Sequence, residues 1–151
     1  MENHLNDTLY HYQEQWVALV NKAMENFGSL TAEEKIWYTV QALIQDVDNG
    51  GFISHYYNYG ADLNEETIES LIALGFPEIA DSLRAINALF PNAQPSKDIA
   101  ERNDVISSWA DEKAEFANNL LNQLDEHFYA AEAALEDDLV ELIKTKIVIE
   151  E

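Results

Sequence analysis

Apolar residues recur every three or four positions along most of this chain, which is the spacing of helices that bury one face. The first predicted helix carries such a stripe, formed by Leu9, Tyr12, Trp16, Val20, Met24 and Phe27. Asn6 or Asp7 is expected to cap its start, and Gly28 to end it. No segment alternates apolar and polar residues as a half-buried strand does. The pattern therefore predicts an all-α fold.

A second helix is predicted to begin after Thr31, because Thr31 and Glu34 have the spacing of a capping box. Its buried stripe consists of Ile36, Trp37, Val40, Leu43, Ile44 and Val47. Two adjacent glycines accept positive φ without steric cost, so Gly50 and Gly51 are expected to end the helix and turn the chain sharply. The aromatic residues that follow are expected to fill the core.

The rest of the chain is also predicted to be helical. Asn64 is the expected N-cap of a short helix that Gly75 ends, and Pro77 suits the first turn of the next helix. From Ser96 onward there is no glycine or proline, and we expect a helix break between residues 125 and 134. A core-facing seam should precede that break, at Ile99, Ile106, Trp109, Phe116 and Leu120. The prediction is a single domain over residues 1–151, a bundle of six or seven helices.

The composition narrows the class of protein further. A chain of 151 residues that is 47% apolar can bury its own core, and its 16 aromatic residues argue against disorder. It has no cysteine, which excludes disulfides and zinc sites built on sulfur. Its first residues resemble no signal peptide, and no apolar run reaches the length of a membrane span. A cytoplasmic location is expected.

The most unusual property of the chain is its charge, because it has 29 acidic and eight basic residues and a net charge of −21. Nucleic acids and anionic membranes repel such a protein, so direct binding to either is not expected. The balance favours a basic partner. The alternative is that the acidity only keeps the protein soluble.

Three groups of carboxylates are candidates for binding such a partner. The first is an outward stripe on the helix after Ser96, formed by Glu101, Asp104, Asp111 and Glu115, with Arg102 and Lys113 on its flanks. The second contains Glu65, Glu66, Glu69, Glu78 and Asp81, and the third contains Glu132, Glu136, Asp137, Asp138 and Glu141. The first group is also compatible with a plain solvated face. The third is equally compatible with helix-dipole stabilisation, with carboxylates at the start of a last helix and Lys144 and Lys146 at its end.

Motifs for metal binding or catalysis are weak. The segment from Asp46 to Ile53 partly matches a calcium loop, but position 5 is Gly50 and position 12 is Tyr57 instead of a bidentate glutamate. The histidines lack metal-ligand spacing, and His55 among tyrosines is more typical of a core or rim residue. We therefore predict no catalytic residue, no metal site and no cofactor.

The segment Asp48-Asn49-Gly50-Gly51-Phe52, followed by Tyr56-Tyr57-Asn58-Tyr59-Gly60, resembles the signature of a bacterial family of small helical domains. The neisserial DNA-mimic protein typifies this family. The signature residues here are Asn49, Gly50, Gly51, Phe52, Tyr56, Tyr57 and Asn58, although Asn58-Tyr59-Gly60 departs from the family's small residues at that turn. The resemblance extends over about residues 31–147 and leaves the first thirty residues outside.

Charge and resemblance together predict an acidic DNA mimic, whose carboxylates replace phosphates in the DNA site of a basic regulator. The resemblance alone implies that this partner is a helix-turn-helix transcription factor, and that the protein is a homodimer. The alternative is a small-molecule or peptide-binding domain that uses the aromatic segment 52–59. An enzyme that uses paired carboxylates is a third alternative.

Overall fold

The computed structural model describes residues 8–148, which form one all-α domain. Its α-helices are α2 (Gln13–Asn26), α3 (Ala32–Gly50), α4 (Phe52–Tyr57), α5 (Asn64–Leu74), α6 (Pro77–Asn87), α7 (Ile99–Glu112) and α8 (Ala114–Leu142). Short 3-10 turns are η1 (Leu9–Tyr12), η2 (Phe27–Ser29), η3 (Tyr59–Leu63) and η4 (Pro91–Ala93), and a π-helical turn, η5 (Ile143–Ile147), follows α8. Residues 8–148 contain no strand, so the predicted fold class is confirmed. The cap candidates Asn6 and Asp7 lie outside the described residues.

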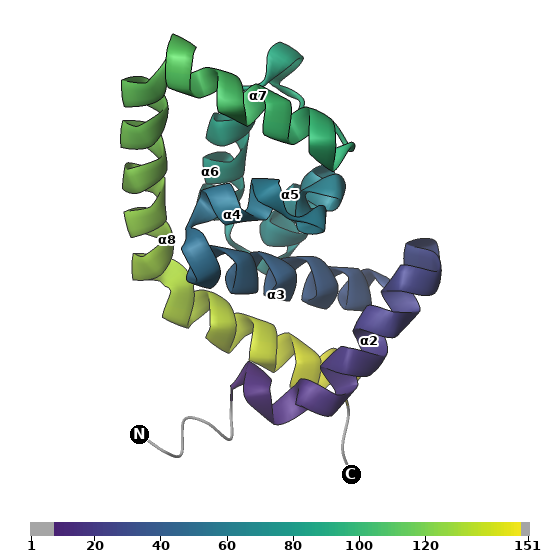
Figure 1. Ribbon diagram of the computed structural model, residues 1–151. Coiled ribbons are helices and arrows are strands. Elements are labelled where there is room, and N and C mark those ends of the chain that lie inside the picture. The colour runs from purple at the N-terminus through teal and green to yellow at the C-terminus, as the bar shows by residue number, and fades with distance from the viewer. Residues whose placement is uncertain (1–7, 149–151) are drawn as a thin grey trace.

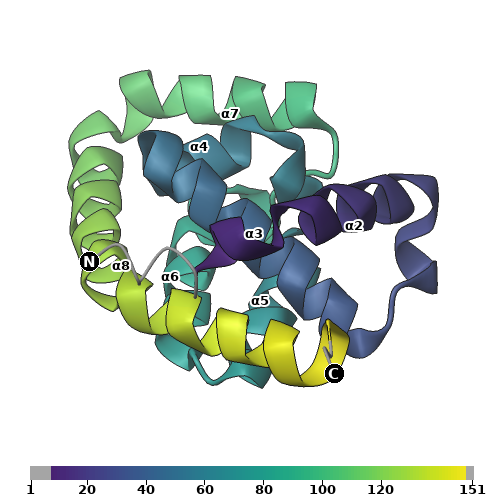
Figure 2. The ribbon, with the colours of Figure 1, turned by 90° about the horizontal axis from the view of Figure 1, so that it is seen from below.

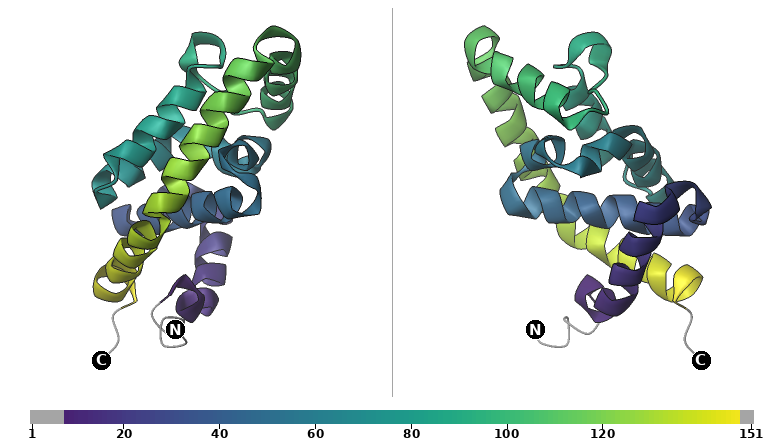
Figure 3. Two further views of the ribbon diagram at one scale, coloured as in Figure 1. Left: turned by 90° about the vertical axis from the view of Figure 1, so that its left-hand side faces the viewer. Right: turned by 45° about the vertical axis from the view of Figure 1, so that its right-hand side comes forward.

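Helix α3 occupies the centre of the molecule. In Figure 1 it crosses the middle, with α4, α5 and α6 above it, α7 at the top, and α8 descending on one side before passing beneath it. The view from below shows α2, α7 and α8 arranged around α3 (Figure 2). Figure 3 shows α6 lying alongside the upper part of α8. Every other layer of the fold is thus built on α3 or on the helices that contact it.

The local sequence of α3 explains both of its ends. Thr31 Oγ1 accepts a hydrogen bond from Glu34 N at 3.1 Å, and Glu34 Oε1 accepts one from Thr31 N at 2.9 Å. This predicted capping box is therefore confirmed. At the other end Gly51 adopts φ 85°, in the region that glycine favours, and turns the chain into α4. The predicted apolar stripe is buried except for Ile36, which is half-buried against the core.

The first helix presents a slightly different face to the core from the one predicted. Met24 is 76% exposed, whereas Leu19 and Ala23 are buried with Trp16. Steps of 3.6 residues from Trp16 fall near Leu19 and Ala23, so these positions share its face and Met24 does not. Trp16 anchors this face by stacking on Tyr38 of α3 at 5.8 Å between ring centroids.

The predicted helix break between residues 125 and 134 is wrong. Helix α8 is continuous from Ala114 to Leu142, although it bends near its middle (Figure 1). The break lies instead at Lys113, whose φ of −158° and ψ of 38° separate α7 from α8. Phe116 therefore does not continue the seam of α7, and it is 62% exposed. Lys113 is neither glycine nor proline, so no local signal in the sequence marks this turn.

Candidate functional site: the signature turn and the acidic surfaces

The turn Asn49-Gly50-Gly51-Phe52, here called the signature turn, is hydrogen-bonded to a carboxylate of α8. Asp125 Oδ1 accepts a hydrogen bond of 2.8 Å from Phe52 N, and thereby caps the start of α4 from a distant part of the chain. A Cβ atom at Gly51 would lie 2.5 Å from Asp125 Oδ2, so only glycine leaves room for this contact. Burial raises the pKa of the Asp125 carboxyl, and the bond from Phe52 partly opposes that shift. The Phe52 side chain is buried against Phe128.

Tyr56 centres a buried polar network. Its hydroxyl donates to Asn87 Oδ1 at 2.7 Å and accepts from Asn64 Nδ2 at 3.4 Å, while Asn87 Nδ2 donates to Asn64 Oδ1 at 2.8 Å. Burial raises the pKa of Tyr56 far above its usual value, so the hydroxyl keeps its proton. The predicted N-cap role of Asn64 is wrong, because Asn64 is the first residue of α5 and its side chain joins this network.

Arg102 is a buried structural anchor that the sequence did not reveal. It was expected on the flank of the outward acidic stripe, yet its side chain is fully buried. Its guanidinium group donates to the backbone carbonyl of Tyr56 and to the carboxylate of Asp62. Its position four residues before Ile106 and seven before Trp109 places it on the buried face of α7, and this spacing was the available signal.

The Arg102 guanidinium connects three segments of the chain. Nε donates to Tyr56 O at 3.0 Å and Nη2 donates to Asn58 O at 2.8 Å. Nη1 donates both to Ser96 O at 2.7 Å and to Asp62 Oδ1 at 2.8 Å. Arg102 therefore binds the carbonyl groups of Tyr56 and Asn58 in the signature segment, and the same guanidinium is held by its ion pair with Asp62.

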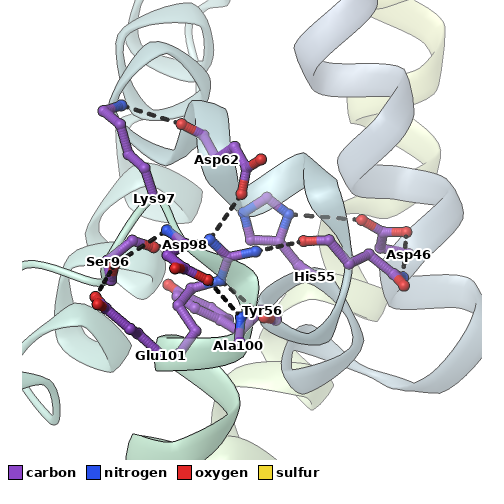
Figure 4. Close-up of polar contacts among 11 residues, drawn as sticks. Asp46, His55, Tyr56, Asp62, Ser96, Lys97, Asp98, Ala100 and Glu101 are labelled. Carbon is purple, nitrogen blue, oxygen red and sulfur yellow. Dashed lines mark hydrogen bonds and ion pairs between the residues drawn. The ribbon is translucent and has the colours of Figure 1, made fainter.

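The aromatic segment 52–59 is divided between the core and the surface. Phe52, His55 and Tyr56 are buried, while Tyr57 and Tyr59 are exposed. His55 Nδ1 lies 3.6 Å from Asp46 Oδ2, and neither ring nitrogen of His55 has a hydrogen-bond partner among the described residues (Figure 4). Asp46 and Asp48 lie within α3, so the calcium-like segment forms a helix end and a glycine turn.

The structure divides the first predicted acidic stripe between two helices. Glu101, Asp104 and Asp111 are exposed on α7, but Glu115 is on α8 beyond the turn at Lys113. Glu101 also accepts a hydrogen bond from Ser96 Oγ at 2.7 Å, which connects it to the loop before α7. A single four-residue stripe along one helix axis is therefore wrong.

The second group lies on α5 and α6. Glu65 and Glu69 are exposed and line a cleft of about 650 Å³ between α5, α6 and the loop before α7. Glu66 is half-buried, and its Oε1 has no hydrogen-bond partner among the described residues. Asp81 pairs with Arg84 at 3.1 Å. The sequence placed these carboxylates together, but it did not show the cleft beside them.

The third group lies near the end of a helix, not at its start. Asp137, Asp138 and Glu141 are exposed in the last turns of α8, because this helix begins at Ala114. The helix dipole stabilises carboxylates only near the start of a helix, so helix-dipole stabilisation does not explain them. Lys144 and Lys146 follow in η5, as a cation at a helix end is expected to do.

Three carboxylates meet where α3 contacts α8. Oxygen atoms of Asp48, Glu132 and Glu136 lie within 4.8 Å of one another, a spacing that suits a hard cation with oxygen ligands. Burial, and then the neighbouring Asp48, raise the pKa of Glu132 to about 8. The sequence placed Glu132 and Glu136 in the third predicted group and gave no sign that Asp48 lies beside them.

These acidic groups do not form one continuous face. Helix α7 lies at the top of the molecule in Figure 1, and the end of α8 lies at the bottom. A single partner surface therefore cannot cover the carboxylates of all three predicted groups as one array. The α8 group is the best candidate, because its positions have no local explanation in helix energetics.

Comparison with known families tests the resemblance of the signature turn. The family model described as DMP19-like protein matches residues 28–146. The chain belongs to the DMP19-like family. The match includes all of the signature residues and every helix from α3 to α8, and it leaves α2 outside. No curated protein and no solved structure matches this DMP19-like chain.

The helices of this DMP19-like protein were also compared with the requirements of a membrane span. Within residues 8–148, none combines the length and the apolar character that crossing a bilayer requires.

Proposed function

We propose that this DMP19-like protein is an acidic binding protein, not an enzyme. It occupies the DNA-binding surface of a basic transcriptional regulator in the cytoplasm and so blocks access to DNA. The family resemblance indicates that the regulator is of the helix-turn-helix class. Lysine and arginine side chains that contact DNA phosphates would contact carboxylates of this protein instead.

The charge balance supports this proposal. Eight basic residues cannot neutralise 29 acidic ones, and Arg102 is buried in a pair with Asp62. Lys22 pairs with Glu34 and Arg84 with Asp81, which uses two more cations. A large excess of negative charge therefore remains on the surface, and it attracts a basic protein over a Debye length of about 8 Å at physiological salt.

The observation that carries the proposal is the position of Asp137, Asp138 and Glu141. These carboxylates are exposed on α8, and none of them pairs with a cation among the described residues. Glu141 follows Asp138 by three residues and Asp137 by four, so like charges share one face of the helix and are expected to cost about 0.2–0.5 kcal/mol per pair. The simplest reason for three such carboxylates within five residues is that they contribute favourable free energy to the binding of another molecule. Binding of a cationic surface supplies such a gain.

Two triple variants test the proposal and the face together. The first changes Asp137, Asp138 and Glu141 to lysine, and the second changes Glu101, Asp104 and Asp111 to lysine. Both variants reverse three charges, so an effect of net charge alone would weaken the binding of both variants to the regulator equally. The second variant is therefore the matched control for the first.

The assay is competition between each variant and a labelled DNA duplex for a basic regulator captured from the source cell, followed by fluorescence anisotropy. Wild-type protein should displace the duplex, less well as salt rises, and the α8 variant should lose this competition. If only the α7 variant fails to compete with DNA, the partner-binding face lies on α7 and not on α8. DNA mimicry would be rejected if both variants compete with DNA as well as the wild type does. It would also be rejected if the wild-type protein does not compete with DNA at all.

A further inference from the structure

A cleft beside α5 and α6 has features of a ligand site that charge mimicry does not use. It has a volume of about 650 Å³ and lies between the start of α5, the end of α6 and the loop 93–97. Sites for small molecules typically have volumes of about 300–1,000 Å³. The cleft combines a polar floor, a charged rim and a wall with unusual backbone geometry.

The floor of the cleft offers hydrogen-bond donors. Asn64 and Asn87 line it, although each is only 7% exposed. Each side-chain amide carries two hydrogens, and one of each pair is engaged, with Tyr56 or with the other asparagine. The second hydrogen of each amide has no acceptor among the described residues. A ligand carbonyl or carboxylate oxygen would supply that acceptor.

The rim of the cleft carries both signs of charge. The Glu65 and Glu69 carboxylates form no hydrogen bond or ion pair with another described residue, so they are available to a ligand ammonium group. Arg84 and Lys97 line the same cleft, and they are two of the eight basic residues in the chain. Arg84 also pairs with the exposed Asp81, and Lys97 donates to Asp62 O, so a ligand carboxylate would add to these contacts or replace them. Cations are scarce in this protein, so their place beside a cleft favours a ligand that also carries an anionic group.

One wall of the cleft is a turn held in an uncommon conformation. Asn92 and Ala93 have φ of 59° and 56°, and Ala93 lines the cleft. Ala93 N donates to Phe90 O at 2.9 Å, which closes the turn. A residue with a Cβ atom rarely adopts positive φ, and such residues concentrate at sites that hold ligands.

We propose that this cleft binds a short, unmodified peptide of two or three residues. Glu65 and Glu69 would hold its terminal ammonium group, Arg84 and Lys97 its terminal carboxylate, and the Asn64 and Asn87 amides its peptide carbonyls. Apolar side chains such as Ile68 and Pro95 in the same lining would contact the side chains of the peptide. The inference is independent of the proposed DNA mimicry, because the cleft uses none of the α8 carboxylates.

The test is titration of the full chain, labelled with ¹⁵N, with tripeptides Ala-Xaa-Ala in which Xaa is apolar, acidic or basic. At millimolar concentration, at least one tripeptide should shift the side-chain amide signals of Asn64 and Asn87 to saturation. Acetylation of its amino terminus or amidation of its carboxyl terminus should weaken binding by about tenfold or more, since each removes one charged contact.

Glu69→Gln and Arg84→Gln should each weaken the same titration by about tenfold, because both side chains are exposed and their loss leaves the fold intact. Glu126→Gln and Lys144→Gln are the matched controls on exposed positions of α8 and η5, and they should have no effect. The inference is overturned if no tripeptide shifts these signals, if blocked peptides bind equally well, or if the shifts map elsewhere. None of these variants should change competition with DNA, so the two proposals fail separately.

Discussion

Replacing Arg102 by methionine should destabilise this protein severely. The substitution preserves much of the side-chain volume but removes four hydrogen bonds, three of them to the carbonyl groups of Tyr56, Asn58 and Ser96. It also leaves Asp62 without the cation that it faces at 2.8 Å. Asp62 is half-exposed, so the main cost comes from the three carbonyl groups left without a donor, at about 1–3 kcal/mol each, and we expect a loss of about 3–5 kcal/mol in all. For a chain of this length, that loss corresponds to a fall in Tm of about 6–20 °C.

Urea unfolding followed by tryptophan fluorescence measures this effect. Lys97→Met is the matched control, because Lys97 is exposed and donates one hydrogen bond, to Asp62 O at 3.1 Å. The control should change the free energy of unfolding by less than about 0.5 kcal/mol. Arg102→Lys should recover little, since a single ammonium group cannot reach all four acceptors. A loss below about 1 kcal/mol for Arg102→Met would show that the network does not hold the signature segment.

Two further predictions concern pH and assembly. Glu132 has its pKa raised from 4.5 to about 8, so the folded state binds more protons than the unfolded state between these values, and stability should fall as pH rises through that window. Asp48→Asn should flatten this fall in urea midpoints measured from pH 5 to pH 9, and an unchanged slope would reject the coupling. Light scattering should give twice 17.2 kDa if the protein is a homodimer. Glu substitutions at the exposed Val17 and Met24 of α2 should then yield a monomer, whereas a dimer that survives them uses another surface.

The sequence predicted correctly those helix ends that depend on interactions between neighbouring residues. The capping box at Thr31, the left-handed glycines at positions 51 and 75, and Pro77 at a helix start each depend on a few neighbouring residues. Such features need no knowledge of the rest of the chain, so the helices they delimit were predicted correctly.

The sequence-based predictions were wrong where a side chain contacts residues that lie far away along the chain. Asn64 lies where an N-cap is expected, but Tyr56 and Asn87 engage its side chain instead. Arg102 looked like a surface cation because its acceptors come from three other segments. The turn at Lys113 moved Glu115 to another helix and placed the α8 carboxylates near its end, which reversed the inference from the helix dipole. The candidate surfaces therefore depended on tertiary packing that periodicity does not report.

The attachment of the signature turn to α8 has a consequence for the order of folding. Asp125 caps α4 across 73 residues, and Tyr129 donates to Val47 O across 82 residues. Contacts this far apart along the chain form only when α8 packs against α3 and α4, so α4, only six residues long, gains its cap only after α8 has docked. Substitutions in this turn should therefore accelerate unfolding and leave the folding rate nearly unchanged, which gives φ-values close to zero. A nascent chain released before residue 125 would contain every signature residue but would lack the carboxylate that caps α4.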